Sequence, residues 1–135
     1  MLMTVILGAQ GLAVLHAAFQ GRDLKRFLDA IPALSSSHDL ETFKGLARRQ
    51  MIAALFQGGL LIVAPACFIW GLTVGHIAPA DFVWLLMPSV LVLLVARSYR
   101  GLEERIWNLP AEDDELRHER DRIVRVWRTR PLPDW

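Results

Sequence analysis

Two long stretches of apolar residues, separated by a short polar segment, dominate the middle of the chain. Residues 51–75 contain no charged side chain, and residues 82–96 form a second apolar run directly before Arg97. At a rise of about 1.5 Å per residue the first run would cover about 37 Å, enough to cross a hydrocarbon core of about 30 Å. Because an isolated strand cannot satisfy its backbone hydrogen bonds in lipid, both runs predict transmembrane helices.

The segment 76–81 interrupts the helical pattern between these two runs. Pro79 has no backbone N–H with which to continue the first helix, and Asp81 is a suitable N-cap residue for the second. A single straight helix through both runs would be far too long for one bilayer. We therefore expect residues 51–100 to form a transmembrane hairpin whose turn lies at residues 76–81.

The first 20 residues form another uncharged, mostly apolar stretch, which is followed directly by the basic segment 22–26. We expect residues 1–20 to form a third, N-terminal membrane helix. The alternative is a helix that lies along the membrane interface, because Gln10, His16 and several glycines dilute its apolarity. In the spanning arrangement the N-terminus would lie on the side of the membrane opposite to residues 22–26.

Small residues recur at helical spacing in these stretches, and such residues allow helices to approach closely in lipid. In the N-terminal stretch they occur every four residues. In the hairpin they occur as an adjacent pair and as a pair four residues apart. The candidate helix-packing residues are Ala9, Ala13, Ala17, Gly21, Gly58, Gly59, Gly71 and Gly75.

Charged residues are concentrated in two segments, residues 21–50 and 101–135. In residues 21–50 we expect two cytoplasmic amphipathic helices. Ser36 or Ser37 would cap the second of them, which is expected to run unbroken into the membrane at Met51. Residues 101–135 are expected to contain a cytoplasmic charged helix followed by an extended C-terminal tail.

The distribution of lysine and arginine predicts the orientation. Basic residues lie before the first run of the hairpin and after the second, and the turn contains none; they are Lys44, Arg48, Arg49, Arg97, Arg100 and Arg105. The positive-inside rule therefore puts both outer ends of the hairpin, and the C-terminus, in the cytoplasm. A chain rich in alanine, leucine and arginine, with only two lysines, favours an origin in a GC-rich bacterial genome. We therefore expect an all-α integral membrane protein of the bacterial inner membrane.

The charged tail has a clear helix pattern, with acidic residues at its start and arginines at its end. The helix is expected to begin near Pro110, because proline is favoured in a first helical turn. Asp113 and Arg117, and likewise Asp121 and Arg125, have the i,i+4 spacing of ion pairs on a helix surface.

A narrow apolar stripe runs along this helix and is too small to form a domain alone. It would dock on the rest of the chain, on the membrane surface or on a partner protein. The terminal tryptophan is a further candidate for contact with a neighbouring subunit. The candidate docking residues are Leu116, Ile123, Trp127 and Trp135.

Motifs that carry chemistry are sparse. The sequence has no glycine-rich phosphate loop, nucleophile elbow or zinc-ligand pattern, and its single cysteine lies in an apolar run. We therefore expect neither an enzyme nor a metal site. His16 is a candidate axial ligand for haem or chlorophyll at membrane depth, and the alternative is a polar contact between helices. Pro65 and Pro88 would kink the hairpin and leave a seam for a quinone or lipid tail.

Three functions fit these features. The favoured one is a non-catalytic accessory or structural subunit of a larger bacterial inner-membrane complex, without a cofactor, whose partners are the lipid bilayer and other membrane-protein subunits. The second is a pigment- or haem-binding subunit of a photosynthetic or respiratory electron-transfer complex. The third is a membrane-shaping or lipid-binding protein. A net formal charge of +1 gives no reason to expect a nucleic-acid partner.

Overall fold

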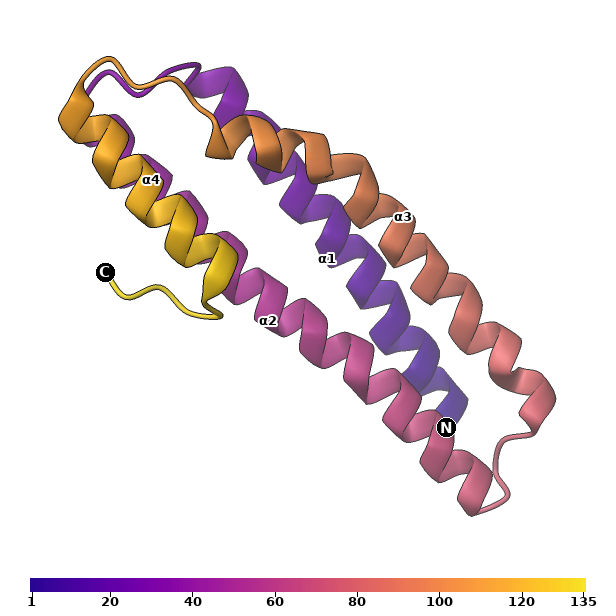
Figure 1. Ribbon diagram of the computed structural model, residues 1–135. Coiled ribbons are helices and arrows are strands. Elements are labelled where there is room, and N and C mark those ends of the chain that lie inside the picture. The colour runs from indigo at the N-terminus through magenta and orange to yellow at the C-terminus, as the bar shows by residue number, and fades with distance from the viewer. The chain divides into compact units, whose positions relative to one another are not determined.

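All regular secondary structure is helical in the computed structural model, which describes residues 1–135 (Figure 1). The elements are α1 (Leu2–Ala30), α2 (Ser37–Thr73), the short 3-10 helix η1 (Pro79–Asp81), α3 (Phe82–Trp107) and α4 (Asp114–Thr129). The predicted all-α class is therefore confirmed. By length and composition, α1, α2 and the segment Pro79–Trp107 are each long and apolar enough to cross a membrane.

The long helices continue through the points where apolar sequence gives way to charged sequence. α1 does not end near residue 20 but extends to Ala30, because its buried apolar face continues among the charged residues. α2 begins in the charged segment and runs unbroken past Met51 to Thr73, as expected. Ser36 caps its start, since the hydroxyl oxygen of Ser36 accepts the N–H of Asp39 at 3.2 Å.

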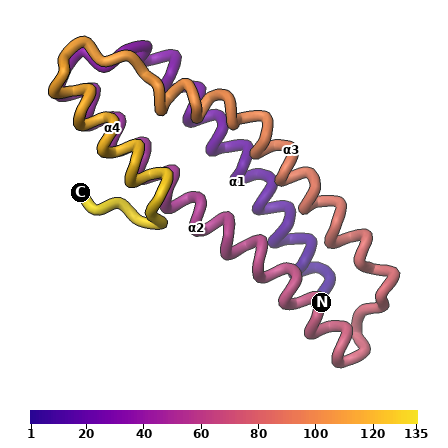
Figure 2. Tube along the Cα trace, in the orientation of Figure 1, coloured from indigo at the N-terminus to yellow at the C-terminus, as the bar shows by residue number.

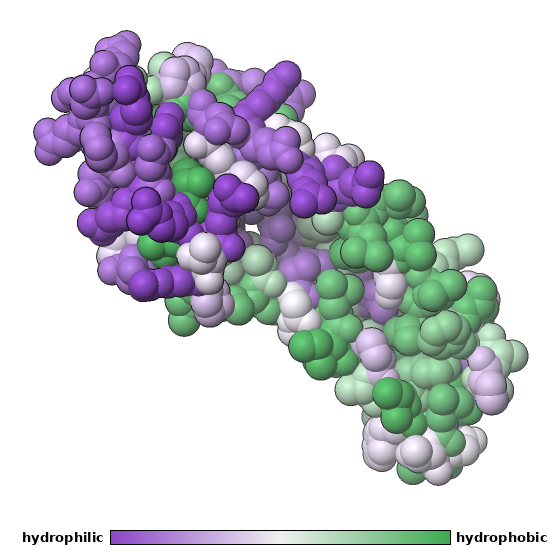
Figure 3. Space-filling view, in the orientation of Figure 1, coloured by the Kyte–Doolittle hydropathy of each residue, from purple (hydrophilic) through white to green (hydrophobic).

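Contacts divide the chain into two compact units. One comprises Met1–Phe19 and Phe56–Ser98, and we call it the apolar unit. The other comprises Gln20–Leu55 and Tyr99–Trp135, and we call it the charged unit. α1, α2 and α3 each contribute a segment to both units, whereas α4 belongs to the charged unit alone. On the face seen in Figure 3, hydrophobic residues gather over the apolar unit and hydrophilic residues over the charged unit.

Segments of α1, α2 and α3 form the apolar unit. Leu2 of α1 lies beside Gly71 of α2, and His16 lies beside Gln57, so these two segments run antiparallel. The core of the apolar unit is small and consists of Ile6, Ala64, Phe68, Ile77 and Leu85. Most of the other large apolar side chains of this unit point outward and are exposed.

Gly75 makes the turn between α2 and α3. Its φ angle of 72° lies in the left-handed region, which residues with a side chain rarely adopt. The N–H of His76 donates to the carbonyl of Gly71 at 2.9 Å and closes the C-terminal end of α2. Asp81 lies just before α3, but it does not cap that helix as predicted. Its carboxylate accepts the N–H of Ala78 at 3.0 Å and so stabilises η1.

α4 lies alongside the first part of α2 in the charged unit (Figure 1, Figure 2). Phe43 of α2 connects the helices, because its ring centroid lies 6.0 Å from that of Phe27 in α1 and 6.4 Å from that of Trp127 in α4. The buried cluster around it comprises Leu24, Phe27, Leu34, Leu40, Phe43, Leu46, Ala47, Ile106, Leu109 and Ile123. The charged unit therefore has a hydrophobic core of its own.

The prediction that the tail helix begins near Pro110 is wrong. The backbone there pairs with another loop: Leu34 donates its N–H to the Pro110 carbonyl at 2.8 Å and accepts the N–H of Glu112 at 3.1 Å. α4 therefore starts at Asp114, after an N-cap position at Asp113. This pairing with a distant loop overrides the local preference of proline for a first helical turn.

We predict that Gly21 is required for packing in the charged unit. It is buried in α1, and a Cβ atom there would overlap with the ring of Tyr99 in α3. Gly21→Ala should therefore lower the free energy of unfolding by about 1–3 kcal/mol. Gly45→Ala is the matched control, because nothing lies within 4 Å of its Cβ position and alanine should be neutral or stabilising. Thermal unfolding followed by circular dichroism compares the two; equal stabilities would contradict the predicted overlap.

Candidate functional site

The predicted small-residue stripe of α1 lies on the buried face of that helix. Ala13 and Ala17 are 0% and 5% exposed, Gly21 is also buried, and Ala9 is partly buried. Small side chains at these positions let neighbouring helices come close to the α1 backbone. The contacts are made within the chain, so the stripe does not by itself indicate a partner protein.

The four glycines predicted to pack in the hairpin have different surroundings. Gly71 is buried beneath Ile77, whose side chain occupies the space that a Cβ atom would need. Gly75 serves the turn beyond the end of α2 rather than a helix contact. Gly58 and Gly59 have nothing within 4 Å of their Cβ positions. Gly59 is exposed and Gly58 is partly buried, so the two leave a strip of α2 backbone without side chains that another helix could approach.

Gln10 and Ser89 form a polar contact between α1 and α3 in the apolar unit. Gln10 is 1% exposed, and its Nε2 donates to the hydroxyl oxygen of Ser89 at 3.1 Å. The Ser89 hydroxyl in turn donates to the carbonyl of Leu85 at 2.8 Å. The amide of Gln10 therefore has a partner in otherwise apolar surroundings, where an unpaired polar group would be costly.

His16 connects α1 to α2. Its Nδ1 lies 3.1 Å from Oε1 of Gln57, and its ring meets the ring of Phe56 edge-on with centroids 5.1 Å apart. Because the Gln57 oxygen can only accept, Nδ1 carries the proton in this hydrogen bond. Nε2 of Gln57 is buried without a hydrogen-bond partner. His16 thus makes the polar contact between helices that the sequence leaves open as the alternative to cofactor ligation.

No group of three or more histidine, cysteine, aspartate or glutamate side chains could hold a metal ion. His38 and His76 are exposed, and Nδ1 of His118 lies 2.7 Å from a carbonyl oxygen of its own helix. The haem or chlorophyll hypothesis, which names His16, stays a prediction. The prolines inside α2 and α3 interrupt neither helix, and a seam for a quinone or lipid tail beside them stays a prediction.

The apolar stripe of α4 faces the core of the charged unit. Ile123 is 0% exposed, and Leu116, Trp127 and Trp135 are partly buried against the same cluster. Val126, which the sequence reasoning did not include, is 7% exposed. Of the three docking possibilities for this stripe, contact with the rest of the chain is the one observed. No partner protein is needed to cover these side chains.

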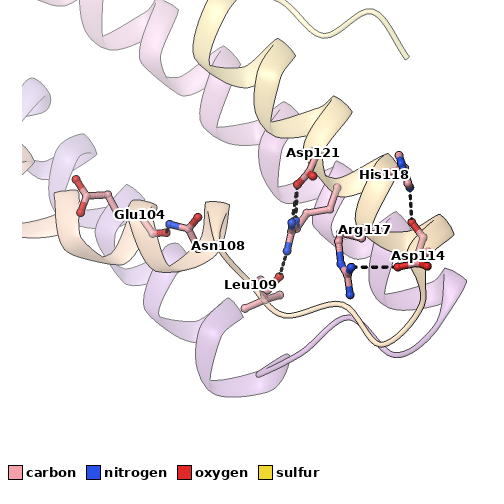
Figure 4. A network of polar contacts seen from close by, with 8 residues as sticks. Glu104, Asn108, Leu109, Asp114, Arg117, His118 and Asp121 are labelled. Carbon is pink, nitrogen blue, oxygen red and sulfur yellow. Dashed lines mark hydrogen bonds and ion pairs between the residues drawn. The ribbon is translucent and has the colours of Figure 1, made fainter.

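Arg120 makes the central polar contact of the charged unit. Its guanidinium donates to the carbonyl of Leu109 at 2.5 Å and pairs with Asp121 at 2.6 Å (Figure 4). The Arg120 side chain is only 15% exposed, and it ties the loop after α3 to α4. The predicted ion pair between Asp121 and Arg125 is wrong. The Asp121 carboxylate pairs with Arg120 instead, whose guanidinium also donates to the Leu109 carbonyl.

The other predicted ion pair of α4 also differs from what its spacing indicates. Arg117 pairs with Asp114 at 3.0 Å (Figure 4), whereas Asp113 occupies the N-cap position. A further pair joins Arg122 to Glu119 at 3.6 Å. All of these side chains are at least one-third exposed, so each pair contributes little to stability.

Sequence reasoning missed the polar partnership inside the apolar unit. A signal for one member was present, since Gln10 is spaced from Ala13 and Ala17 like a residue on the same helix face. Its partner Ser89 lies 79 residues away, and no periodicity connects the two. The buried polar side chain could therefore be found from the sequence, whereas its partner required the fold.

Known proteins offer no assignment for this chain. A scan against protein-family models, a search of curated proteins and a search of solved structures each gave no match.

The contact between Gln10 and Ser89 should couple α1 to α3 energetically. Gln10→Leu keeps much of the side-chain volume but removes the amide, and Ser89→Ala removes the hydroxyl. Each change should lower the free energy of unfolding. Ser89→Ala leaves the buried amide of Gln10 without its partner, and Gln10→Leu removes the donor to the Ser89 hydroxyl, which keeps its own bond to the Leu85 carbonyl. A double-mutant cycle, measured by equilibrium unfolding in detergent solution, should give a coupling energy of about 0.5–1.5 kcal/mol. Strictly additive effects would show that the contact does not stabilise the protein.

Proposed function

We propose that α1, α2 and α3 span a membrane through the apolar unit. The support lies in its outer surface, where Phe19, Ile62 and Leu93 are 63%, 71% and 65% exposed, one on each helix. Many neighbouring side chains on these helices are equally apolar and exposed. Soluble proteins rarely leave such large apolar patches uncovered. Lipid tails would cover this surface without a protein partner.

We further propose that residues 21–50 and 101–135 face the cytoplasm of a bacterium, with the protein in the inner membrane. Basic residues follow the first apolar segment, precede the second and follow the third, and the turn at residues 76–81 contains none. The positive-inside rule supports this orientation. Since α1 and α2 run antiparallel in the apolar unit, the N-terminus would share the outer side with the turn.

Arginine substitutions distinguish a lipid-facing surface from a water-facing one. Ile62 is 71% exposed, so little packing within the chain would resist a longer side chain there. In a membrane, Ile62→Arg should cost about 2.5–3.5 kcal/mol of insertion free energy, whereas Ala78→Arg in the turn should cost little. A translocon-dependent insertion assay measures both variants. If arginine were tolerated equally at the two positions, the membrane assignment of α2 would be wrong.

We propose that the protein is a non-catalytic accessory or structural subunit of a larger membrane complex. The observation that carries this proposal is the strip of α2 at Gly58 and Gly59, where no other part of the chain lies within 4 Å of either Cβ position. Ile62, Ala66 and Ile69 are exposed further along the same helix at spacings of three and four residues. A helix of another subunit could approach closely at the glycines and pack against the larger side chains.

The two other functions have no contact that specifically favours them. Membrane shaping would use the hairpin together with helices at the membrane interface, and α4 does not offer its apolar stripe for this, because Ile123 and Val126 are buried in the core of the charged unit. Pigment binding would use His16, whose Nδ1 contacts Gln57 and whose ring meets Phe56, and neither contact specifically favours a pigment. The subunit function, by contrast, uses a surface that the chain leaves uncovered.

Gly59→Leu tests the subunit proposal. In mild detergent the unaltered protein should elute from native membranes in a complex much larger than 15.3 kDa. Gly59→Leu should release the free chain, because the leucine side chain fills the space needed for close approach. Gly11→Leu on α1 is the matched control, since this glycine is also exposed with nothing within 4 Å of its Cβ position. Size-exclusion chromatography with immunodetection measures all three samples.

Two results would contradict this proposal. Elution of the unaltered protein as a monomer at every detergent concentration would mean that no stable complex exists. Loss of the complex in both glycine variants would mean that a bulky residue on any apolar helix disrupts assembly, and that Gly58 and Gly59 do not mark the contact.

A further inference from the structure

We infer that a groove in the charged unit binds the phosphate group of an anionic ligand. The groove lies between the last turn of α3 and the second half of α4 and has a volume of about 480 Å³. Trp107 lines it from α3, and Arg120, Asp121, Arg125 and Arg128 line it from α4. The inference is independent of the proposed subunit function, because that function uses no residue of this groove.

Two arginines of the groove have no acidic partner. Asp121 is the only carboxylate in the lining, and Arg120 holds it through two guanidinium nitrogens at 2.9 and 2.6 Å. Arg125 and Arg128 take part in none of the ion pairs of α4 and the tail. Three arginines and one aspartate give the lining a net formal charge of +2. The groove therefore attracts anions, and it has two guanidinium groups available to bind them.

Trp107 supplies a second, independent observation. Its Nε1 is buried and has no hydrogen-bond partner within the chain. The guanidinium of Arg128 lies 5.1 Å from the centroid of the same ring. A buried N–H without an acceptor destabilises the fold, so an anion oxygen that reached Nε1 would remove this penalty.

A phosphate group matches this set of donors. Guanidinium groups bind phosphate oxygens through paired N–H bonds, and one phosphate has enough oxygens to meet Arg125, Arg128 and the Trp107 indole together. Two sources offer the same chemistry, the headgroup of an anionic lipid and a soluble phosphate. Basic pockets on the cytoplasmic side of membrane proteins bind lipid headgroups, so both sources belong in the test.

The indole N–H of Trp107 provides a direct readout of this groove. The full chain is labelled with nitrogen-15 tryptophan in a non-ionic detergent, and the Trp107 signal is the one missing from the spectrum of Trp107→Phe. One arm titrates inorganic phosphate, with sodium chloride of equal ionic strength as its control. The other arm titrates dihexanoyl phosphatidylglycerol, with dihexanoyl phosphatidylcholine as its control. A saturable shift of the Trp107 signal in either arm supports the inference, and the arm that responds identifies the source.

Paired variants of α4 separate the groove from general surface charge. The double variant Arg125→Gln and Arg128→Gln should weaken binding about tenfold or more. The double variant Arg117→Gln and Arg122→Gln removes the same charge from ion-paired positions outside the groove, and affinity should stay within about twofold. All four arginines are exposed, so both variants should keep the helical circular dichroism spectrum. An unmoved Trp107 signal with both ligands, or equal losses in the two variants, would overturn the inference.

Discussion

In both units, the packing of the helices depends on how closely their neighbours can approach one face of α1. Buried positions recur along this helix at spacings of three and four residues; they are Ile6, Gln10, Ala13, Ala17, Gly21, Leu24 and Phe27. The residues on this face are small where another side chain comes near, as at Gly21 beneath the ring of Tyr99. The face is polar where a hydrogen bond crosses to α3, as at Gln10. A larger residue in place of Gly21 would push the helices apart. Loss of the hydrogen-bond partner of Gln10 would leave a buried polar group unpaired and destabilise the packing.

The features that sequence reasoning predicted correctly are those set by local pattern. The unbroken course of α2 follows from an apolar run joined to a capped, amphipathic start, and the turn near Pro79 follows from a proline and a glycine. The predictions are wrong where a contact with another segment of the chain determines the local structure. α4 begins at Asp114 rather than near Pro110 because Leu34 forms backbone hydrogen bonds with the preceding segment. Asp121 pairs with Arg120 rather than Arg125 because the Leu109 carbonyl accepts a hydrogen bond from Arg120 and fixes its guanidinium beside Asp121. Spacing along one helix carries no information about such partners.

The core of the charged unit narrows the functional possibilities. A chain that left the apolar stripe of α4 open would need a membrane surface or a partner to cover it. Instead, Ile123 and Trp127 pack against residues of α1 and α2, and Arg120 ties the preceding loop to the same helix. The outward face of α4 is left with charges, of which only some are paired. Partner contacts are therefore better sought at uncovered surfaces, such as the glycines of α2 and the arginine groove.

The chemical type of the polar contacts in the apolar unit bears on its surroundings. Helices are connected there by an amide with a hydroxyl and by an imidazole with an amide, not by ion pairs. Burying a charged pair in a medium of low dielectric constant has a desolvation cost that the attraction between the charges seldom offsets. Neutral hydrogen-bonded groups avoid most of this cost. In the charged unit, water can solvate both partners of the exposed ion pairs of α4, Arg117 with Asp114 and Arg122 with Glu119. The use of Gln10, Ser89, His16 and Gln57 in place of charged residues is thus the choice expected for helices that lipid surrounds, and it supports the proposed span independently of hydropathy.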